Sequence, residues 1–400
     1  KSTKITSNYI HLTSSGMSAL HTSLEIIYKL FPAKPTLQIG FPYVDVLKLP
    51  MNIFHGAKLL TEENCNDIEL EIKNIDPAAL IIELPSNPML KCVNIKKISK
   101  IASKLNIPII IDDTIGSNLN INSIEHADIV FTSLTKIFSG SGDIMAGSLI
   151  LNSKSKWISQ FRNALTNIKL PKLSDGDVIS LEKVSRDVHE RVFKHNKLCL
   201  ELKKRLETHK EIKNIFHPEN CPNFNSILTS NGGYGCLLSF ELKGGLDKAK
   251  KFYDSLQISK GPSLGTNFTL VCPYVLLAHY DELDWVESFG IPSHLIRVSV
   301  GLEDKDQLWR TFSKALNIAP DDIRANNIIG VINFNQENYE EAAFHFANAA
   351  ISSFENADYE NLAENIIYLE KIKKINSKII NEKIMKKLYI ALNGRKKNEF

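Results

Sequence analysis

A lysine lies among small and hydroxyl-bearing residues in the first half of this chain. Residues 133–142 read Ser-Leu-Thr-Lys-Ile-Phe-Ser-Gly-Ser-Gly and follow an apolar run typical of a buried strand. Open α/β sheets bind ligands at the carboxyl ends of their strands, where Lys136 would emerge. An amine flanked by the hydroxyls of Ser133 and Thr135 suits a phosphorylated aldehyde. Alone the segment is weak evidence, because most lysines are surface residues.

A carboxylate ends another apolar run. Residues 108–112 read Pro-Ile-Ile-Ile-Asp, and Asp113 follows. A carboxylate at the end of a buried strand could pair with a protonated pyridine nitrogen and keep that ring an electron sink. The alternative is that either acid caps the next helix. We favour Asp112 for the ring and assign Asp113 to a cap or a supporting contact.

Two further segments could contact a phosphorylated ring. Residues 14–20 read Ser-Ser-Gly-Met-Ser-Ala-Leu and open an amphipathic helix, so free backbone N–H groups would point at an anion. An ordinary N-cap is the alternative. Residues 83–88 read Glu-Leu-Pro-Ser-Asn-Pro, a strand end and rigid turn that would hold the Asn87 amide near a ring hydroxyl.

An arginine interrupts an otherwise apolar strand pattern near residue 300. Residues 295–300 read Leu-Ile-Arg-Val-Ser-Val. A buried cation is unfavourable unless it is paired, and the planar fork of Arg297 matches a carboxylate. The partner would be a substrate carboxylate or, alternatively, an internal Asp or Glu.

These residues need a sheet to position them. Apolar runs at residues 79–84, 108–112, 127–132 and 145–151 predict buried strands, and residues 95–105 predict a crossover helix. Continuous apolar strands are typical of a largely parallel sheet that is covered on both faces. Residues 176–209 predict one long helix that leaves this large domain. Alternating runs at 234–242 and 295–300 and a helix at 305–316 predict a smaller α+β domain.

The character of the chain changes near Pro320. The spacing of Gly330, Ala342, Phe346 and Ala349 resembles a tetratricopeptide (TPR) repeat, and an ordinary helical hairpin is the alternative. Residues 357–390 are also predicted to be helical, although they match the repeat pattern poorly. A single repeat cannot bury its own apolar face, so it would pack on the helices that follow or on further repeats.

The order of the motifs resembles the cystathionine γ-synthase family of Cys/Met-metabolism enzymes over roughly residues 10–318. The segments that carry the resemblance are Ser-Ser-Gly-Met at 14–17, Glu-x-Pro-Ser-Asn-Pro at 83–88, Asp-x-Thr at 112–114, Ser-x-Thr-Lys at 133–136, Ser-Leu-Gly at 263–265 and Arg-x-Ser-x-Gly-x-Glu-Asp at 297–304. The resemblance implies an α/β, type I aminotransferase-like fold that binds pyridoxal 5'-phosphate (PLP). Its expected parts are a large PLP-binding domain at 1–180, a small α+β domain at 181–319 and a helical, TPR-like extension at 320–400.

The resemblance also implies roles for individual residues. Lys136 would carry the cofactor, and Asp112 would contact its ring nitrogen. Asn87 would lie near the ring hydroxyl, and Arg297, helped by Ser263, would bind the substrate α-carboxylate. The residues expected to hold the phosphate are Gly16, Met17, Ser133 and Thr135.

Three features depart from the usual family pattern. Residues 40–45 read Gly-Phe-Pro-Tyr-Val-Asp where the family places a tyrosine on the cofactor ring, so Tyr43 or, less favoured, Phe41 would stack there. This motif is similar to that of a divergent fungal branch of the family. The usual Glu after Ser-Leu-Gly is replaced by Thr266, so this position does not indicate which substrate is preferred. The family's N-terminal arm would precede residue 1, so we expect the sequence to be a fragment of a longer protein.

Composition excludes several other classes. The chain has 400 residues, a net charge of +3 and 43% hydrophobic residues, which indicates a globular protein without a nucleic-acid-binding charge pattern. The six cysteines lack zinc-ligand spacing, so no metal is expected, and scattered cysteines fit a reducing compartment. No apolar run predicts a membrane span and no signal peptide is evident, which favours the cytoplasm.

The predicted activity is a γ-replacement in transsulfuration, in which cysteine displaces the leaving group of an activated homoserine ester to give cystathionine. A cystathionine lyase or a sulfhydrylase is the alternative within the family. A degenerate PLP fold that acts as a TPR-type interaction module is the alternative from another class. Expected partners are small amino-acid substrates and further copies of the chain, with a protein partner at the C-terminal helices as a further possibility.

Overall fold

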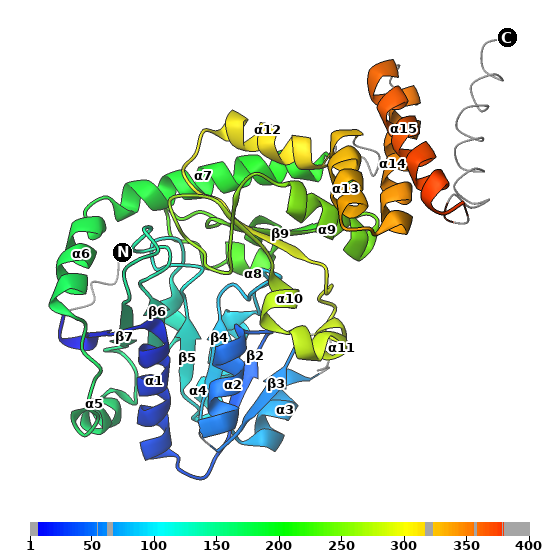
Figure 1. Ribbon diagram of the computed structural model, residues 1–400. Coiled ribbons are helices and arrows are strands. Elements are labelled where there is room, and N and C mark those ends of the chain that lie inside the picture. Colours follow the sequence, from blue (N-terminus) through cyan, green and yellow to red (C-terminus); the bar gives the residue numbers. More distant parts are fainter. Residues whose placement is uncertain are drawn as a thin grey trace. The chain divides into compact units, whose positions relative to one another are not determined.

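The computed structural model describes residues 7–53, 55–61, 67–316, 323–355, 358–377 and 379 (Figure 1). The chain divides into two compact units, Lys1–Phe312 and Ser313–Phe400. The first unit contains two sheets, and the described part of the second is helical. Cys65 and the predicted helix beyond residue 379 lie outside the described residues.

The larger sheet has seven strands in the order β1-β7-β6-β5-β4-β2-β3. Its strands are β1 (Ile10–Thr13), β2 (Thr36–Ile39), β3 (Ala57–Leu60), β4 (Leu80–Glu83), β5 (Ile109–Asp112), β6 (Ile129–Ser133) and β7 (Gly147–Leu151). Strands β6, β5, β4, β2 and β3 run parallel, whereas β7 and β1 are antiparallel to their neighbours. The four predicted strands therefore correspond to β4–β7, and the sheet is largely parallel as expected.

Helices cover both faces of this sheet, because successive side chains of a strand point to opposite faces. Ile110 of β5 packs with residues of α1, α2 and α5, whereas Ile109 and Ile111 pack with residues of α3 and α4. The helices on these faces are α1 (Gly16–Leu30), α2 (Val44–Ile53) and α5 (Ile158–Thr166), then α3 (Ile68–Ile75) and α4 (Ile95–Leu105). Short 3-10 turns lie at Ser7–Tyr9 and Ser123–His126.

The single helix predicted at 176–209 is wrong, because two helices occupy this segment. They are α6 (Asp175–Ser185) and α7 (Val188–Glu207), and Arg186 and Asp187 separate them. No glycine or proline marks the break. It coincides with contacts of Arg191, which binds the Val184 carbonyl across the gap and two carbonyls distant in sequence.

The smaller sheet has the order β10-β11-β12-β9-β8 and is antiparallel except for the β10–β11 pair. Its strands are β8 (Ile212–Phe216), β9 (Leu237–Leu242), β10 (Ser259–Lys260), β11 (Leu270–Pro273) and β12 (Ile296–Ser299). The accompanying helices are α8 (Pro222–Asn225), α9 (Gly245–Ser255), α10 (Tyr274–Ala278), α11 (Leu283–Glu287) and α12 (Lys305–Leu316), with 3-10 turns at Pro218–Asn220 and Tyr280–Glu282. Strand β12, which carries Arg297, lies in the middle of this sheet.

The second unit contains α13 (Ile323–Asn335), α14 (Tyr339–Glu355) and α15 (Tyr359–Ile375). Helix α14 packs against both of the others. A Cβ atom at Gly330 would lie 2.7 Å from the Phe346 ring, so the glycine lets α13 approach α14 closely. The assignment of these helices to a TPR repeat stays a prediction.

None of the helices in the described ranges is long and apolar enough to cross a membrane.

Candidate cofactor and substrate site

The carboxyl ends of three neighbouring strands bring the predicted residues together. Glu83 ends β4, Asp112 ends β5, and Ser133 ends β6, with Lys136 three residues further on. Glu83 and Asp112 lie directly opposite each other in the parallel register. This edge of the sheet is where α/β folds bind ligands, as the sequence predicts.

The structure separates the roles of the two adjacent aspartates. Both carboxylate oxygens of Asp113 accept hydroxyl hydrogen bonds, from Ser123 at 2.8 Å and from Thr132. One oxygen of Asp112 accepts the backbone N–H of Thr114 at 2.9 Å. Burial raises the pKa of Asp112 to about 7, since no cation among the described residues pairs with it. Asp113 is therefore held by two side-chain hydroxyls, whereas Asp112 is the less fully hydrogen-bonded carboxylate.

Glu83 is a site residue that sequence reasoning missed. One oxygen of its buried carboxyl group accepts the backbone N–H of Tyr43 at 2.9 Å and that of Asn87 at 3.2 Å. Burial, and then the nearby charge of Asp112, raise the pKa of Glu83 well above its usual value. The signal was present, because Glu83 ends an apolar run just as Asp112 does. Glu83 fixes the two segments that were expected to flank the cofactor ring.

The start of α1 forms a close contact with the end of β6. Ser15 caps α1 by accepting the N–H of Ser18 at 3.1 Å, so the predicted N-cap exists. A Cβ atom at Gly16 would lie 2.6 Å from the Cβ of Ser133, and only glycine fits there. The N–H groups of Gly16 and Met17 stand at the first turn, where a helix offers free donors to an anion.

The hydroxyl of Thr135 is already engaged. It accepts the backbone N–H of Ala146 at 3.1 Å and lies 3.3 Å from the carbonyl oxygen of the same residue. Ser133, in contrast, is held through its backbone N–H, which donates to Thr114 at 2.9 Å. This leaves Ser133 a better candidate than Thr135 for a phosphate contact.

Lys136 reaches across to a residue of the 263–267 loop. Its Nζ lies 3.0 Å from Oγ of Ser263, and the side chain is half-buried. Burial, and then the charge of Arg297, lower the pKa of Lys136. A lysine with a lowered pKa is more often neutral, which a nucleophile or a base requires.

Arg297 is buried at 2% exposure and makes no ion pair with any described residue. Its guanidinium donates to Oδ1 of Asn87 at 3.1 Å and to the carbonyls of Pro262 and Ser263, the latter at 3.2 Å. It also lies over the ring of Tyr274, 4.6 Å from the centroid, a contact that no sequence motif signalled. Its Nε has no oxygen or nitrogen partner among the described residues, although the Cys272 thiol lies beside the guanidinium. The predicted alternative of an internal ion pair is therefore absent from the described part of the chain.

The two aromatic candidates for ring stacking have different surroundings. Phe41 is buried against His279, Trp285 and Phe289, with ring centroids 5.5–5.6 Å away. Tyr43 is half-buried beside Asp45, and burial, followed by this contact, raises its pKa to about 12. Because Phe41 is enclosed by other rings, the packing favours Tyr43 for a cofactor contact.

The described residues fit PLP. Gly16 packs directly on Ser133, which brings the free N–H groups of the first turn of α1 to the end of β6, where a phosphate would bind. Asp112 offers a carboxylate that lacks a cation, which suits a protonated ring nitrogen. A half-buried amine, Lys136, lies at the same edge of the sheet. The unpartnered Nε of Arg297 leaves a donor for a carboxylate on a molecule bound beside them.

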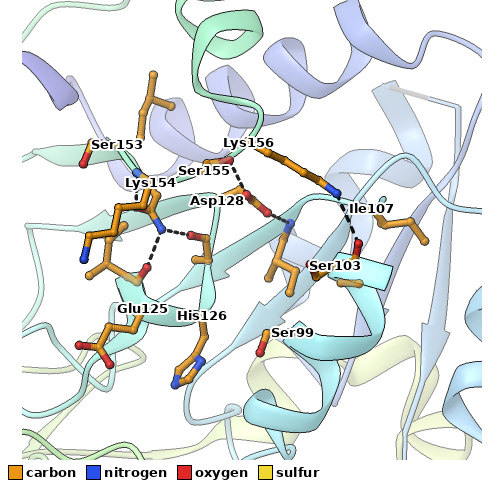
Figure 2. A pocket seen from close by; sticks show the side chains of 16 residues that line it. Ser99, Ser103, Ile107, Glu125, His126, Asp128, Ser153, Lys154, Ser155 and Lys156 are labelled. Carbon is orange, nitrogen blue, oxygen red and sulfur yellow. Dashed lines mark hydrogen bonds between the residues drawn. The ribbon is translucent and has the colours of Figure 1, made fainter. Parts of the chain in front are cut away.

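A cavity of about 410 Å3 lies elsewhere, at the amino ends of β5 and β6 (Figure 2). Some of its polar groups are already engaged: Asp128 accepts the N–H of Ile109 at 2.8 Å and the hydroxyl of Ser155. Lys156 donates to Asn106 at 2.6 Å. None of the predicted site residues lines this cavity.

Comparisons with known proteins agree with this geometry. The family model of the Cys/Met metabolism PLP-dependent enzymes matches residues 6–317. The cystathionine gamma-synthase of Neurospora crassa is 38% identical over 328 residues, which cover 78% of this chain and 52% of that protein. The cystathionine gamma-synthase of Saccharomyces cerevisiae is 39% identical over 310 residues, which cover 72% and 47%. The chain thus spans about half the length of these curated relatives.

Solved structures show the same fold. The cystathionine gamma synthase from Xanthomonas oryzae pv. oryzae, solved with aminoacrylate and cysteine, superposes with a TM-score of 0.68 at 22% identity. The match covers 77% of this chain and 80% of that one. The expectation of a PLP-dependent transferase fold for the first unit is therefore confirmed.

Proposed function

The chain belongs to the Cys/Met metabolism PLP-dependent enzymes, and from that membership we propose that it carries out a γ-replacement on an activated homoserine ester. Cysteine would displace the ester group from the γ-carbon, and the product would be cystathionine. The names of the fungal relatives support this choice of substrates.

The observation that carries the proposal is the position of Arg297. A buried guanidinium without a carboxylate partner is unfavourable, and a substrate α-carboxylate would relieve it. Ser263 connects this group to the reactive lysine, since its carbonyl accepts from Arg297 and its hydroxyl contacts Lys136. A carboxylate at Arg297 would therefore place the α-carbon of an amino acid near Lys136.

The residues of the site have separate tasks in this reaction. Bound PLP supplies an electron sink for the bonds at the substrate α-carbon. Lys136 would hold the cofactor and then move protons at the α- and β-carbons, which its lowered pKa favours. Asp112 would hold the proton on the ring nitrogen, and the first turn of α1 would bind the phosphate. Glu83 would keep Tyr43 and Asn87 beside the ring through their backbone N–H groups.

The first test concerns the cofactor. The 400-residue chain with PLP should develop a visible absorbance band, and borohydride should then attach the cofactor covalently to the peptide that contains Lys136. The variant Lys136→Ala should lose the covalent attachment and at least about 1000-fold in turnover, because nucleophile and base are removed together. Attachment to another lysine, or full turnover of the variant, would contradict the assignment.

The second test concerns the substrate. The PLP-loaded chain is supplied with O-acetylhomoserine and cysteine, with O-acetylhomoserine and sulfide, or with cystathionine alone, and the products are identified by mass spectrometry. Cystathionine in the first reaction supports the proposal. Homocysteine formed only with sulfide would indicate a sulfhydrylase, and breakdown of cystathionine alone would indicate a lyase.

A further inference from the structure

The segment that carries Lys136 satisfies only part of its own backbone. We refer to residues 133–140 as the Lys136 loop. Within it, the N–H of Ser139 donates to the Leu134 carbonyl at 2.9 Å, and that of Gly140 donates to the Lys136 carbonyl at 3.0 Å. The Ser139 hydroxyl donates to the Thr135 carbonyl at 2.7 Å. The carbonyls of Ile137 and Phe138 receive no donor from within the loop.

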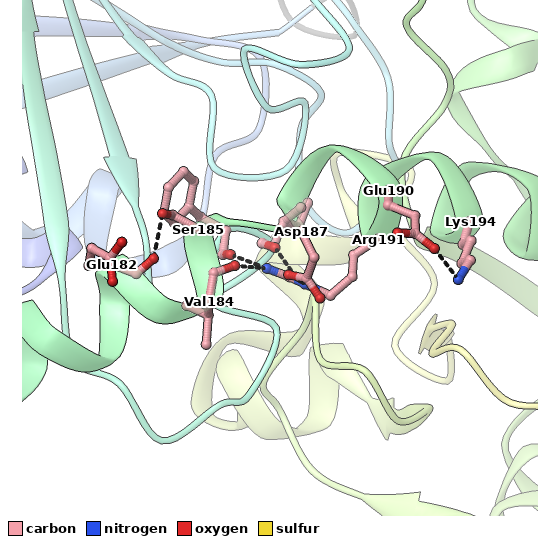
Figure 3. Close-up of polar contacts among 9 residues, drawn as sticks. Glu182, Val184, Ser185, Asp187, Glu190, Arg191 and Lys194 are labelled. Atoms are coloured by element: carbon pink, nitrogen blue, oxygen red, sulfur yellow. Dashed lines mark hydrogen bonds and ion pairs between the residues drawn. The ribbon is translucent and has the colours of Figure 1, made fainter.

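Arg191 of α7 supplies the missing donors (Figure 3). Its Nη1 donates to the Ile137 carbonyl at 3.3 Å, and its Nη2 donates to that of Phe138 at 2.8 Å. The same Nη2 contacts the Val184 carbonyl at 2.9 Å, and Nε pairs with Asp187 at 2.8 Å. Arg191 is buried, at 6% exposure. One guanidinium therefore joins the loop to the junction between α6 and α7.

Gly140 leaves the space that this guanidinium occupies. Its φ is +69°, and a Cβ there would lie 2.4 Å from Nη1 of Arg191 and 2.7 Å from Oδ1 of Asn267. The Gly140 carbonyl accepts the N–H of Asn267 at 2.7 Å. The loop is thus held from one side by α7 and from the other by the segment that follows Ser263.

We propose that Arg191 is a positioning residue that fixes the backbone following Lys136, so that its Nζ stays opposite Ser263. The consequence for cofactor binding rests on the proposed function, whereas the effect on the loop does not. A lysine carries its donors on a single nitrogen, so it could not reproduce the separate Nη1 and Nη2 contacts of the planar guanidinium. The proposal therefore predicts that Arg191→Lys retains only part of the effect.

The experiment compares Arg191→Gln, Arg191→Lys and Arg186→Gln in the whole chain. Arg186 is the matched control: it lies at the same helix junction but is exposed, and pairs only with Glu182 at 3.0–3.1 Å. Amide hydrogen exchange is measured without cofactor, over residues 134–142 and over β5. We expect Arg191→Gln to speed exchange in the loop about tenfold or more, because the carbonyls of Ile137 and Phe138 lose their guanidinium donors. Exchange in β5 should stay unchanged, Arg191→Lys should be intermediate, and Arg186→Gln should match the unaltered chain.

A second readout is the dissociation constant for PLP, followed by absorbance. Arg191→Gln should raise it about tenfold, and Gly140→Ala should raise it similarly by pushing the guanidinium aside. Unchanged loop exchange in Arg191→Gln, or an equal increase in β5, would overturn the proposal, the latter because it indicates a general loss of stability. If the unaltered chain failed to bind PLP, the proposed function would fail, while the exchange experiment would still decide the role of Arg191.

Discussion

The carboxyl groups of Glu83 and Asp112 lie together at one edge of the larger sheet, and they differ in their hydrogen bonds. Glu83 and Asp112 lie in register on adjacent strands, and both are buried. Glu83 accepts two backbone N–H groups, whereas Asp112 accepts one and has no cation partner within the described chain. Glu83 therefore fixes two backbone segments, whereas Asp112 is the carboxyl group that we propose for a positively charged group of the ligand.

The raised pKa of Asp112 predicts how the stability of the cofactor-free chain depends on pH. In the unfolded chain this group ionises near 3.8, but in the folded chain it ionises only near 7. Its contribution is therefore most favourable below pH 4 and is lost as pH rises through 7, a difference of roughly 4 kcal/mol in the free energy of unfolding.

Asp112→Asn removes this dependence. We expect the free energy of unfolding of the variant, relative to the unaltered chain, to increase by about 3 kcal/mol between pH 5 and pH 7.5. Urea denaturation of cofactor-free protein at both pH values measures it. The exposed Asp281 provides the control, since Asp281→Asn should show little change between the two pH values. If both variants showed the same change in free energy of unfolding between the two pH values, the pKa of Asp112 would not be raised as predicted.

The principal candidate residues could be selected from the sequence because each stands in or next to a recognisable strand. Lys136, Asp112 and Arg297 follow or interrupt apolar runs, and the resemblance to the family supplied their roles. Tyr274 and Arg191 escaped notice because their contacts reach Arg297 and the Lys136 loop from distant segments. Such contacts depend on how elements pack, which a local pattern does not encode.

At the scale of elements, the first turn of α1 depends on the absence of a side chain at Gly16. Alanine is usually the better helix residue, by about 1 kcal/mol. Here its Cβ would meet Ser133 at 2.6 Å, and backbone would have to move. We expect Gly16→Ala to lower the free energy of unfolding by about 1–3 kcal/mol and to weaken PLP binding.

Gly176 in the first turn of α6 is the matched control, because nothing lies closer than 3.8 Å to the Cβ it would gain. Gly176→Ala should leave PLP binding unchanged and stabilise the chain slightly. Calorimetry and a PLP titration of both variants provide the comparison. If the two glycine variants behaved alike, the contact between α1 and β6 would not constrain the site.

The buried face of α7 carries a second titratable group one turn after Arg191. His195 is 2% exposed, and neither of its ring nitrogens has a hydrogen-bond partner in the part of the chain that the structure describes. Burial, and then the charge of Arg191, lower its pKa to about 4. In the unfolded chain His195 is protonated below about pH 6.5, whereas in the folded chain it stays neutral down to about pH 4. The free energy of unfolding therefore falls as pH drops from 6.5 towards 4, by about 3 kcal/mol in total.

His195→Leu should remove this loss. The free energy of unfolding of the variant, relative to the unaltered chain, should increase as pH is lowered from 7 to 4.5, measured by urea denaturation. His189 lies on the exposed side of the same helix, and His189→Leu should show much less of this change. If the difference in free energy of unfolding between His195→Leu and the unaltered chain did not change with pH, the prediction that His195 is protonated only in the unfolded chain would be wrong.

The elements themselves were predictable in proportion to their apolar content. Strands β4–β7 were recognised because they are predominantly apolar, whereas β1 and β3 are partly exposed. The division between α6 and α7 could not be predicted, since helix-compatible residues span it. It becomes intelligible only from the contacts of Arg191 with carbonyls about fifty positions earlier.

At the scale of the whole molecule, the second unit has a core of its own. Phe346, Ala342 and Ala343 of α14 pack with Leu369 and Ile372 of α15. The lysine, aspartate and arginine of the candidate site all belong to the first unit. We therefore expect a change in the core of the second unit to leave the candidate site unaltered.

Gly330→Ala tests this separation. Its Cβ would meet the Phe346 ring at 2.7 Å, and we expect hydrogen exchange in α13 and α14 to increase, which corresponds to a local destabilisation of about 1–3 kcal/mol. Exchange in β4 and β5 and attachment of PLP to Lys136 should remain unchanged. Ile328→Ala is the control, because that side chain is 61% exposed. Loss of PLP attachment in Gly330→Ala would show that the second unit supports the site.

The contacts that hold the Lys136 loop come from residues that are synthesised after it. The Lys136 loop is completed by Arg191 and Asn267, which follow it by many residues, and its lysine faces Ser263. The arginine of the site comes later still, on β12. A nascent chain that has just exposed the lysine therefore has no finished site. On the proposed function, the substrate carboxylate has no binding partner until β12 has left the ribosome, when most of the first unit is already free to fold.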